Sequence, residues 1–218
     1  LIFSESTGMD VKWRIDHLEK PESVVYDMKS DCLYVSNING GALELDKNGF
    51  ISKISITGKV IEKEWVTGLD GPKGLAISNN NLYVADINKI WKISLSDRSK
   101  KFYKVNDTGF LNDLTVDKLG NIYASDMTKN RIYMLRGNQV NIWKTLLFSP
   151  NGLLVDKENL IVAQWGSTTE DFETKTTGYL VKIDLKTREI SRFFSTRPIG
   201  NLDGLVFNKD KGYLATDW

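Results

Sequence analysis

A short motif recurs five times along the chain, and this repetition restricts the fold more than any other feature of the sequence. Each copy has a polar residue in its second position and apolar residues after it, and a second apolar run follows a polar turn. The copies occupy residues 21–25, 72–76, 111–115, 150–154 and 202–206. Their second positions fall at 22, 73, 112, 151 and 203, so the intervals are 51, 39, 39 and 52 residues and the basic unit has about 39.

The content of one unit indicates strands. The apolar runs are short, rich in Val, Ile, Tyr and Leu, and separated by Asp, Asn and Gly, which predicts four antiparallel strands per unit. We expect third strands at residues 42–45, 90–93, 131–135 and 180–184, and fourth strands at 53–56, 101–105, 140–143 and 192–194. Four strands at this period form one propeller blade, so the sequence predicts an all-β fold, a β-propeller that forms one domain over residues 1–218.

The closure of the ring is a separate expectation. We favour six blades over five, with about one and a half blades beyond Trp218, because the fifth unit ends there after its second strand. Residues 11–18 are expected to supply an outer strand that closes the ring. The long intervals predict loop insertions, one of them the polar segment 167–177 near a blade rim. A start at Leu1 implies that upstream residues were removed, a signal peptide possible among them.

Composition excludes several partners. Lys and Arg total 29 against 28 for Asp and Glu, which leaves no basic excess to attract nucleic acid or anionic lipid. No apolar run approaches the roughly 18 residues that would span a membrane. The single cysteine, Cys32, excludes an internal disulfide and is expected to be buried in a strand. Localisation stays open between the cytoplasm and a periplasmic or secreted state, as does the oligomeric state.

The second position of the motif is where chemistry is expected. The first strand of a propeller blade lines the central channel, so these positions converge at one mouth of it. They hold Glu22, Lys73, Asn112, Asn151 and Asp203. Four of the five carry a side-chain oxygen and none is His or Cys, which favours a hard cation, Ca²⁺ first or Mg²⁺, over Zn²⁺. The alternative is a polar channel mouth that is simply wet, as in propellers without catalytic activity.

The order of these residues carries a resemblance to a known family. Glu22 in unit one, Asn112-Asp113 in unit three, Asn151-Gly152-Leu153 in unit four and Asp203-Gly204-Leu205 in unit five resemble the SMP-30/gluconolactonase/LRE-like propellers, which include diisopropylfluorophosphatase-type phosphotriesterases. The resemblance implies that Glu22, Asn112, Asn151 and Asp203 bind a catalytic divalent cation. It further implies a hydrolase that opens lactones or cleaves esters, with phosphotriester hydrolysis as a side activity and Asp203 as general base or nucleophile.

The sequence departs from the sugar-lactone members of that family around Asn112. Phe110, Leu111 and Leu114 occur where those members carry an Arg and a Gly, so the usual contacts to sugar hydroxyls are not expected. A more apolar mouth, with Phe110 and Trp165 as substrate contacts, favours an aromatic or aliphatic lactone or ester. Lys73 either binds a substrate anion or points to solvent, and we favour solvent.

A second hypothesis is a propeller without catalytic activity. Asp86 and Asp126 both end a second strand, and Asn130-Arg131-Ile132 after Asp126 is similar to NHL repeats. Such a module would bind a ligand or a protein. We expect the repeated Asp to accept backbone N–H groups in the turn and so to be structural.

Overall fold

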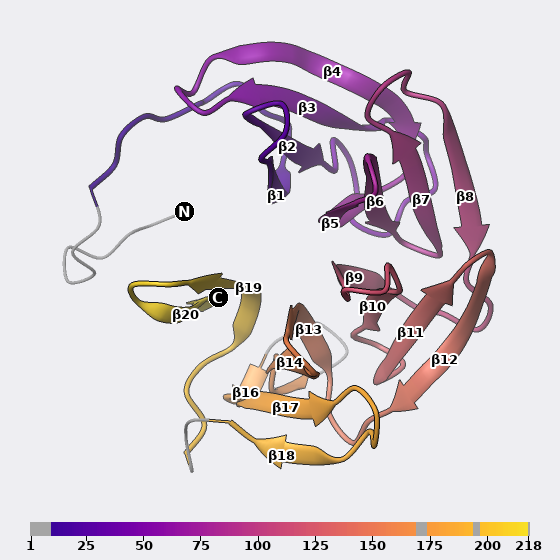
Figure 1. The fold of residues 1–218 in the computed structure, drawn as a ribbon, viewed down its shortest axis with the longest axis vertical. Coiled ribbons are helices and arrows are strands. Elements are labelled where there is room, and N and C mark those ends of the chain that lie inside the picture. The colour runs from indigo at the N-terminus through magenta and orange to yellow at the C-terminus, as the bar shows by residue number, and fades with distance from the viewer. Residues whose placement is uncertain (1–9, 169–173, 194–196, 218) are drawn as a thin grey trace.

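The computed structural model describes residues 10–168, 174–193 and 197–217, and these form successive antiparallel sheets arranged as propeller blades around a common axis (Figure 1). Blade one contains β1 (Pro21–Asp27), β2 (Cys32–Asn37), β3 (Gly49–Ser55) and β4 (Val60–Leu69). Blade two contains β5 (Pro72–Ser78), β6 (Asn81–Asp86), β7 (Lys89–Ser94) and β8 (Lys100–Lys104). Blade three contains β9 (Leu111–Val116), β10 (Ile122–Asp126), β11 (Arg131–Arg136) and β12 (Gln139–Thr145). Within the described residues there is no helix, and hence none suited to crossing a membrane.

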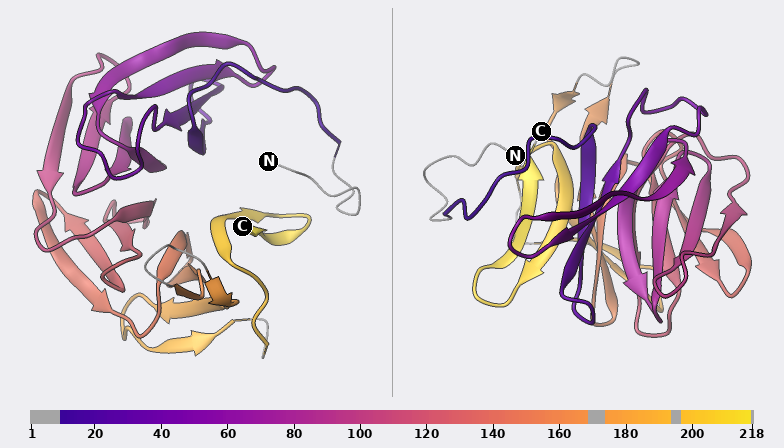
Figure 2. Two further views of the ribbon diagram at one scale, coloured as in Figure 1. Left: turned by 180° about the vertical axis from the view of Figure 1, so that it is seen from behind. Right: turned by 90° about the horizontal axis from the view of Figure 1, so that it is seen from above.

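Blade four contains β13 (Pro150–Asp156), β14 (Asn159–Gln164), β17 (Leu180–Asp184) and β18 (Ile190–Arg192). A hairpin of β15 (Ser167–Thr168) and β16 (Thr174–Thr176) interrupts it, and the orange pair rises from one face of the blades (Figure 2, right). Blade five is described as β19 (Leu202–Asn208) and β20 (Gly212–Asp217). The five strands that begin at the motif lie nearest the axis (Figure 1). The all-β propeller is thus confirmed, while the six-blade ring stays a prediction.

Blades two, three and four match the expected strands closely, and blade one does not. Residues 42–45 lie in the connection between β2 and β3, and the third and fourth strands are 49–55 and 60–69. The reason is burial. Ile51 and Ile54 of β3 are at most 1% exposed, whereas Leu43 and Leu45 are 51% and 59% exposed and supply nothing to the core.

Two further expectations concern the N-terminal segment and the insertion. Residues 11–18 pair with no strand of the described chain, and Trp13 donates its indole N–H to the Ile56 carbonyl, 2.9 Å away, on the β3–β4 turn. The ring-closing strand stays a prediction, because its expected partners belong to a final blade that is not among the described strands. The insertion at 167–177 contains the β15–β16 hairpin, with 169–173 outside the described residues. Strand β18 ends at Arg192, and Phe194 of the expected strand also lies outside them. Cys32 opens β2 and is buried, as expected.

Neighbouring blades are joined by apolar side chains and by a repeated arginine contact. The Arg98 guanidinium lies 5.6 Å from the Trp65 ring and binds both oxygens of Glu62, so the β7–β8 turn holds the outer strand of blade one. Arg188, in the β17–β18 turn, lies 5.6 Å from the Trp143 ring of blade three and donates to the Trp143 carbonyl. Stacking of this kind uses the flat guanidinium and the face of the indole ring. It fixes the outer strands, while the apolar core fixes the inner ones.

The innermost strands approach each other closely, and glycine makes this possible. A Cβ on Gly152 would meet the Asp203 carbonyl oxygen of β19 well within the 3.0 Å that real Cβ atoms keep. A Cβ on Gly74 would similarly collide with Asp113 of β9. Both glycines directly follow the second motif position, so this spacing brings the inner ends of adjacent blades together where the candidate site lies.

Gly152→Ala should therefore be destabilising in a way that Gly204→Ala is not. Gly204 holds the same motif position in blade five, but there a Cβ meets only the Thr216 hydroxyl at an ordinary 3.4 Å. We expect Gly152→Ala to lower the free energy of unfolding by about 3 kcal/mol, because backbone must move. Gly204→Ala should change it by less than about 0.5 kcal/mol. Urea unfolding curves measure both, and equal effects would show that β13 and β19 are not closely packed.

Candidate functional site

The second motif position lies in a β-bulge in every blade. Glu22 and Ser23 of β1 together face the single residue Ser36 of β2, and the same two-against-one pairing recurs in β5, β9, β13 and β19. In blades one, three and five a hydroxyl on the second strand accepts the N–H that the bulge leaves unpaired, as in Ser23 to Ser36 at 3.0 Å. A bulge bends its strand and re-aims a side chain. The five second positions therefore start from one shared backbone distortion.

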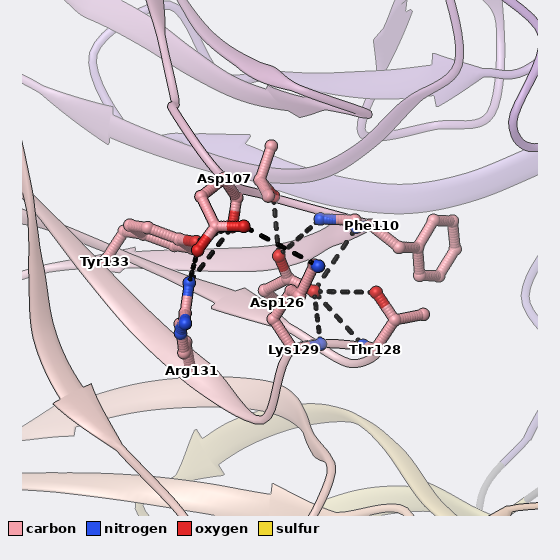
Figure 3. Close-up of polar contacts among 9 residues, drawn as sticks. Asp107, Phe110, Asp126, Thr128, Lys129, Arg131 and Tyr133 are labelled. Carbon is pink, nitrogen blue, oxygen red and sulfur yellow. Dashed lines mark hydrogen bonds and ion pairs between the residues drawn. The ribbon is translucent and has the colours of Figure 1, made fainter.

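A carboxylate at the end of the second strand fixes the chain just before the bulge. In blade three the two oxygens of Asp126 accept the N–H groups of Gly109 at 2.9 Å and Phe110 at 3.3 Å, directly upstream of β9 (Figure 3). The same carboxylate also accepts the N–H groups of Thr128 and Lys129 after β10. One buried side chain thus positions both the segment that leads into β9 and the segment that follows β10.

The same contact recurs in other blades with the equivalent residue. Asp86 accepts the N–H of Gly71 at 2.7 Å, just before β5. The equivalent residue of blade one is Asn37, which accepts the Glu19 N–H at 3.1 Å. In blade five Asp217 accepts the Asn201 N–H at 2.7 Å. The expected structural role of Asp86 and Asp126 is confirmed.

Three of the four expected metal ligands form one connected group. The Asn112 amide donates to the Asn151 Oδ1, and the Asn151 amide donates to the Leu202 carbonyl at 3.2 Å. Burial raises the pKa of Asp203, and a side-chain hydrogen bond from Asn151 to its carboxylate partly opposes that rise. Asn151 thus links blade three to blade five.

The fourth expected ligand, Glu22, joins this group through electrostatics. Its residue is exposed as a whole, yet its carboxyl group lies deep among protein atoms, and desolvation raises the pKa of Glu22 well above its ordinary value. Repulsion from Asp203 and then Asp113 raises that pKa further. Desolvation also raises the pKa of the half-buried Asp203. The five second motif positions, 22, 73, 112, 151 and 203, are called the column from here on. The column therefore holds carboxylates whose negative charges disfavour one another.

Asp113 belongs to this group although the sequence analysis assigned it no role. Its carboxylate accepts the Leu114 N–H at 2.8 Å and, across the blade boundary, the Leu153 N–H at 2.7 Å. Burial raises the pKa of Asp113 to about 7, against the effect of these two hydrogen bonds, and repulsion from Asp203 adds to the increase. The sequence feature that could have indicated this role is the position of Asp113 directly after Asn112 in the motif.

Lys73 corrects the preferred interpretation that it points to solvent. Its residue is 1% exposed, and its ammonium donates to the carbonyls of Gly71 at 2.8 Å and Ala42 at 2.9 Å. Burial lowers the pKa of Lys73 to about 8, an effect that the nearby Glu22 partly opposes. Because its ammonium already binds two carbonyls and is shielded from solvent, Lys73 is poorly suited to bind a substrate anion.

The two aromatic residues expected to contact substrate differ in position. The Phe110 ring is half-buried and lies 4.6 Å from the Lys73 ammonium, so the structure places it beside the second-position column. Trp165 is buried, directly after β14, and its backbone N–H donates to the Ser149 carbonyl at 3.1 Å. Of the two, Phe110 is the one that the described contacts bring to the column.

The donor chemistry of the column fits a hard divalent cation. Glu22, Asn112, Asn151 and Asp203 can supply only oxygen ligands. A cation would offset the burial that raises the pKa of both carboxyl groups and the repulsion that raises the pKa of Glu22 further. In the part of the chain that the structure describes, no three His, Cys, Asp or Glu side chains are grouped as a metal site. Any cation here would thus depend on the two amides as well as the carboxylates.

Comparison with known proteins supports the fold. No protein-family model and no curated sequence matches the chain. Among solved structures, virginiamycin B lyase from Staphylococcus aureus is 17% identical with a TM-score of 0.64 over 90% of this chain and 63% of the lyase. A catalytically inactive variant of that lyase with Quinupristin is 14% identical, with a TM-score of 0.62 over 91% and 78%. A nidogen/laminin complex is 20% identical, with a TM-score of 0.62 over 82% and 64%.

These similarities show a propeller fold and do not show a shared activity, because the identities are low. The chain spans about 63% of the length of the first lyase structure. The neighbours include a lyase and a protein complex. The residues of the candidate site must therefore carry the functional argument.

Asp126→Ala tests whether the carboxylate positions the channel mouth. The substitution leaves several part-buried N–H groups without their carboxylate acceptor, so the free energy of unfolding should fall by about 2–4 kcal/mol. The matched control is Asp107→Ala, which removes an exposed carboxylate that pairs with Arg131. We expect the control to have a clearly smaller effect in urea unfolding. Equal effects would contradict the positioning role.

Glu22→Gln tests the carboxylate repulsion in metal-free protein. Because the folded pKa is raised, the folded state holds its proton above pH 4.5 while the unfolded chain releases it, so Glu22 makes the protein less stable as the pH rises. In chelator, Glu22→Gln should melt above the wild type at pH 8 and equal it at pH 4. Glu64→Gln, on exposed outer strand β4, is the control and should leave the pH profile unchanged. An unaltered profile for Glu22→Gln would exclude the repulsion.

Proposed function

We propose that this chain is a divalent-metal-dependent hydrolase of lactones or esters, with Ca²⁺ the first candidate and Mg²⁺ the second. The observation that carries the proposal is the placement of two amides and two carboxylates on equivalent bulges of four blades, with Asn151 in contact with both Asn112 and Asp203. Oxygen ligands of mixed charge suit a hard cation that keeps positions for water and substrate. Phosphotriesters are a possible secondary substrate class.

The reaction assigns roles to the residues present. A cation held by Glu22, Asn112, Asn151 and Asp203 would polarise the substrate carbonyl and stabilise the developing oxyanion. Asp203, half-buried and with a raised pKa, is suited to accept the proton of a water that attacks the carbonyl. It would return that proton to the departing alkoxide, which balances the hydrolysis. Direct attack by Asp203, with an acyl-enzyme then hydrolysed, is the alternative. The hydrogen bond from Asn151 orients the carboxylate in either case.

The second candidate is a ligand- or protein-binding module without catalytic activity. The observation that favours it is the Asp126 cluster, in which Asp107 and Arg131 form an ion pair at 2.5 Å beside a repeated structural aspartate, as in NHL-like repeats (Figure 3). A propeller neighbour found in a nidogen/laminin complex fits such a role. This candidate predicts no dependence of partner binding on the four ligand residues.

Asp203→Asn distinguishes the two candidates. Saturating Ca²⁺ should raise the melting temperature of chelator-treated wild-type protein by roughly 5–10 °C, since a ligand at 100 times its Kd adds about 2.7 kcal/mol. Asp203→Asn should abolish most of that shift and lower hydrolysis across a panel of lactones and esters by at least about 100-fold. Asp210→Asn, an exposed carboxylate on the β19–β20 turn, is the control and should behave as wild type. Wild-type melting that ignores every divalent ion would overturn the metal-dependent hydrolase.

A further inference from the structure

The connection between β2 and β3, residues 38–48, lies at the same face as the candidate site. Second strands run antiparallel to first strands, so β2 ends at the face where β1 begins and where Glu22 lies. The connection has 11 residues, against the two, 87 and 88, that join β6 to β7 in blade two. It therefore supplies nine of the 12 residues by which the first motif interval, 51, exceeds the second, 39, and it adds them beside the channel mouth.

Three hydrogen bonds hold this connection against blades one and two. Lys20 donates to the Gly40 carbonyl at 2.7 Å, and Lys73 donates to the Ala42 carbonyl at 2.9 Å. The Lys47 N–H donates to the Asp70 carboxylate at 3.1 Å. The connection thus has a defined position without being a strand.

Lys73 is the contact that relates the connection to the site. It occupies the second motif position of blade two, in line with the four oxygen-bearing residues. Its ammonium donates to Ala42 of the connection and lies 4.6 Å from the Phe110 ring of blade three. A buried ammonium needs such partners because burial of a charge is costly. Lys73 thus contacts both the connection and Phe110, so the two lie on the same side of the channel mouth.

The connection presents apolar side chains to solvent. Leu43 follows Ala42 directly and is 51% exposed, and Leu45 is 59% exposed. Single exposed leucines are ordinary on protein surfaces. These two are close in sequence to the backbone that Lys73 binds, and Lys73 in turn contacts the half-buried Phe110. Covering such a rim with an apolar part of a ligand would remove carbon surface from water.

We propose that residues 38–48 form a specificity wall of the active site, in which Leu43 and Leu45 contact the alkyl chain of an aliphatic lactone. Lys73 is a positioning residue that holds this wall at the mouth through the Ala42 carbonyl. The inference rests on the proposed hydrolase and narrows its substrate class to lactones with an alkyl substituent. Polyhydroxylated lactones would gain nothing from the two leucines.

The test compares γ-decalactone with γ-butyrolactone, which share the ring and differ in the alkyl chain. The double substitution Leu43→Ser and Leu45→Ser should lower kcat/KM for γ-decalactone roughly tenfold through KM and leave γ-butyrolactone unchanged. The control is Leu119→Ser, an exposed leucine on the β9–β10 turn at the opposite face, which should alter neither substrate. Loss of the same size for both lactones, or for neither, would overturn the wall.

Lys73→Met tests the positioning role separately. Methionine keeps an unbranched apolar stem but lacks the ammonium that binds the Ala42 carbonyl, so KM for γ-decalactone should rise while kcat and the Ca²⁺-induced melting shift are retained. Chymotrypsin should also cleave after Leu43 or Leu45 faster than in the wild type. An unchanged cleavage rate together with an unchanged KM would exclude Lys73 as the anchor, and the double leucine variant decides the wall even if Lys73→Met fails to fold.

Protection from chymotrypsin separates this inference from the hydrolase proposal. γ-Decalactone should slow cleavage after Leu43 and Leu45 in wild-type protein, and γ-butyrolactone should not. Absence of any hydrolysis together with selective protection would overturn the hydrolase and keep residues 38–48 as a ligand-binding wall. Hydrolysis without selective protection would keep the hydrolase and overturn the wall.

Discussion

The side chain that ends the second strand of a blade accepts N–H groups from the chain that leads into the first strand. Asp86, Asp126, Asn37 and Asp217 all make this contact. The segment they bind precedes the strand and lies outside the ladder, so its N–H groups have no strand partner, and a buried N–H without an acceptor costs roughly 1–3 kcal/mol. In blades one, two, three and five the start of the innermost strand is therefore fixed from within its own blade, and the position that faces the channel depends on it.

The bulge that follows separates the chemistry of the site from the stability of the fold. All five first strands share the same irregular pairing, whatever residue stands in the second motif position. Glu, Lys, Asn and Asp occupy equivalent backbone there, so the blade architecture tolerates changes of charge at the mouth. One residue later, blades two and four leave no room for a side chain, because Gly74 and Gly152 lie against the neighbouring strand. In these two blades close packing restricts the third motif position, while the charge at the second position can vary.

The sequence predicted the fold where local pattern and burial agree. The repeat period, the turn residues and the composition of the strands located the blades, because each unit has the same local sequence pattern. The prediction of the third strand of blade one was wrong because the run that contains Leu43 and Leu45 has the apolar residues typical of a strand. Ile51 and Ile54 supply the core instead, and only burial in the folded protein distinguishes the two runs. Lys73 was misjudged for a similar reason: its partner, the Ala42 carbonyl, belongs to a connection whose path no periodicity reveals.

The charge balance of the column supports a cation in place of a merely wet mouth. Glu22, Asp113 and Asp203 repel one another, and the only cationic member of the column, Lys73, is occupied by two carbonyls. Repulsion of this kind is relieved either by protons or by a divalent ion. Protons would neutralise only the carboxylates. A divalent ion would place two positive charges against these three carboxylates and could also bind amide oxygens, including the Asn151 Oδ1 that here accepts the Asn112 amide.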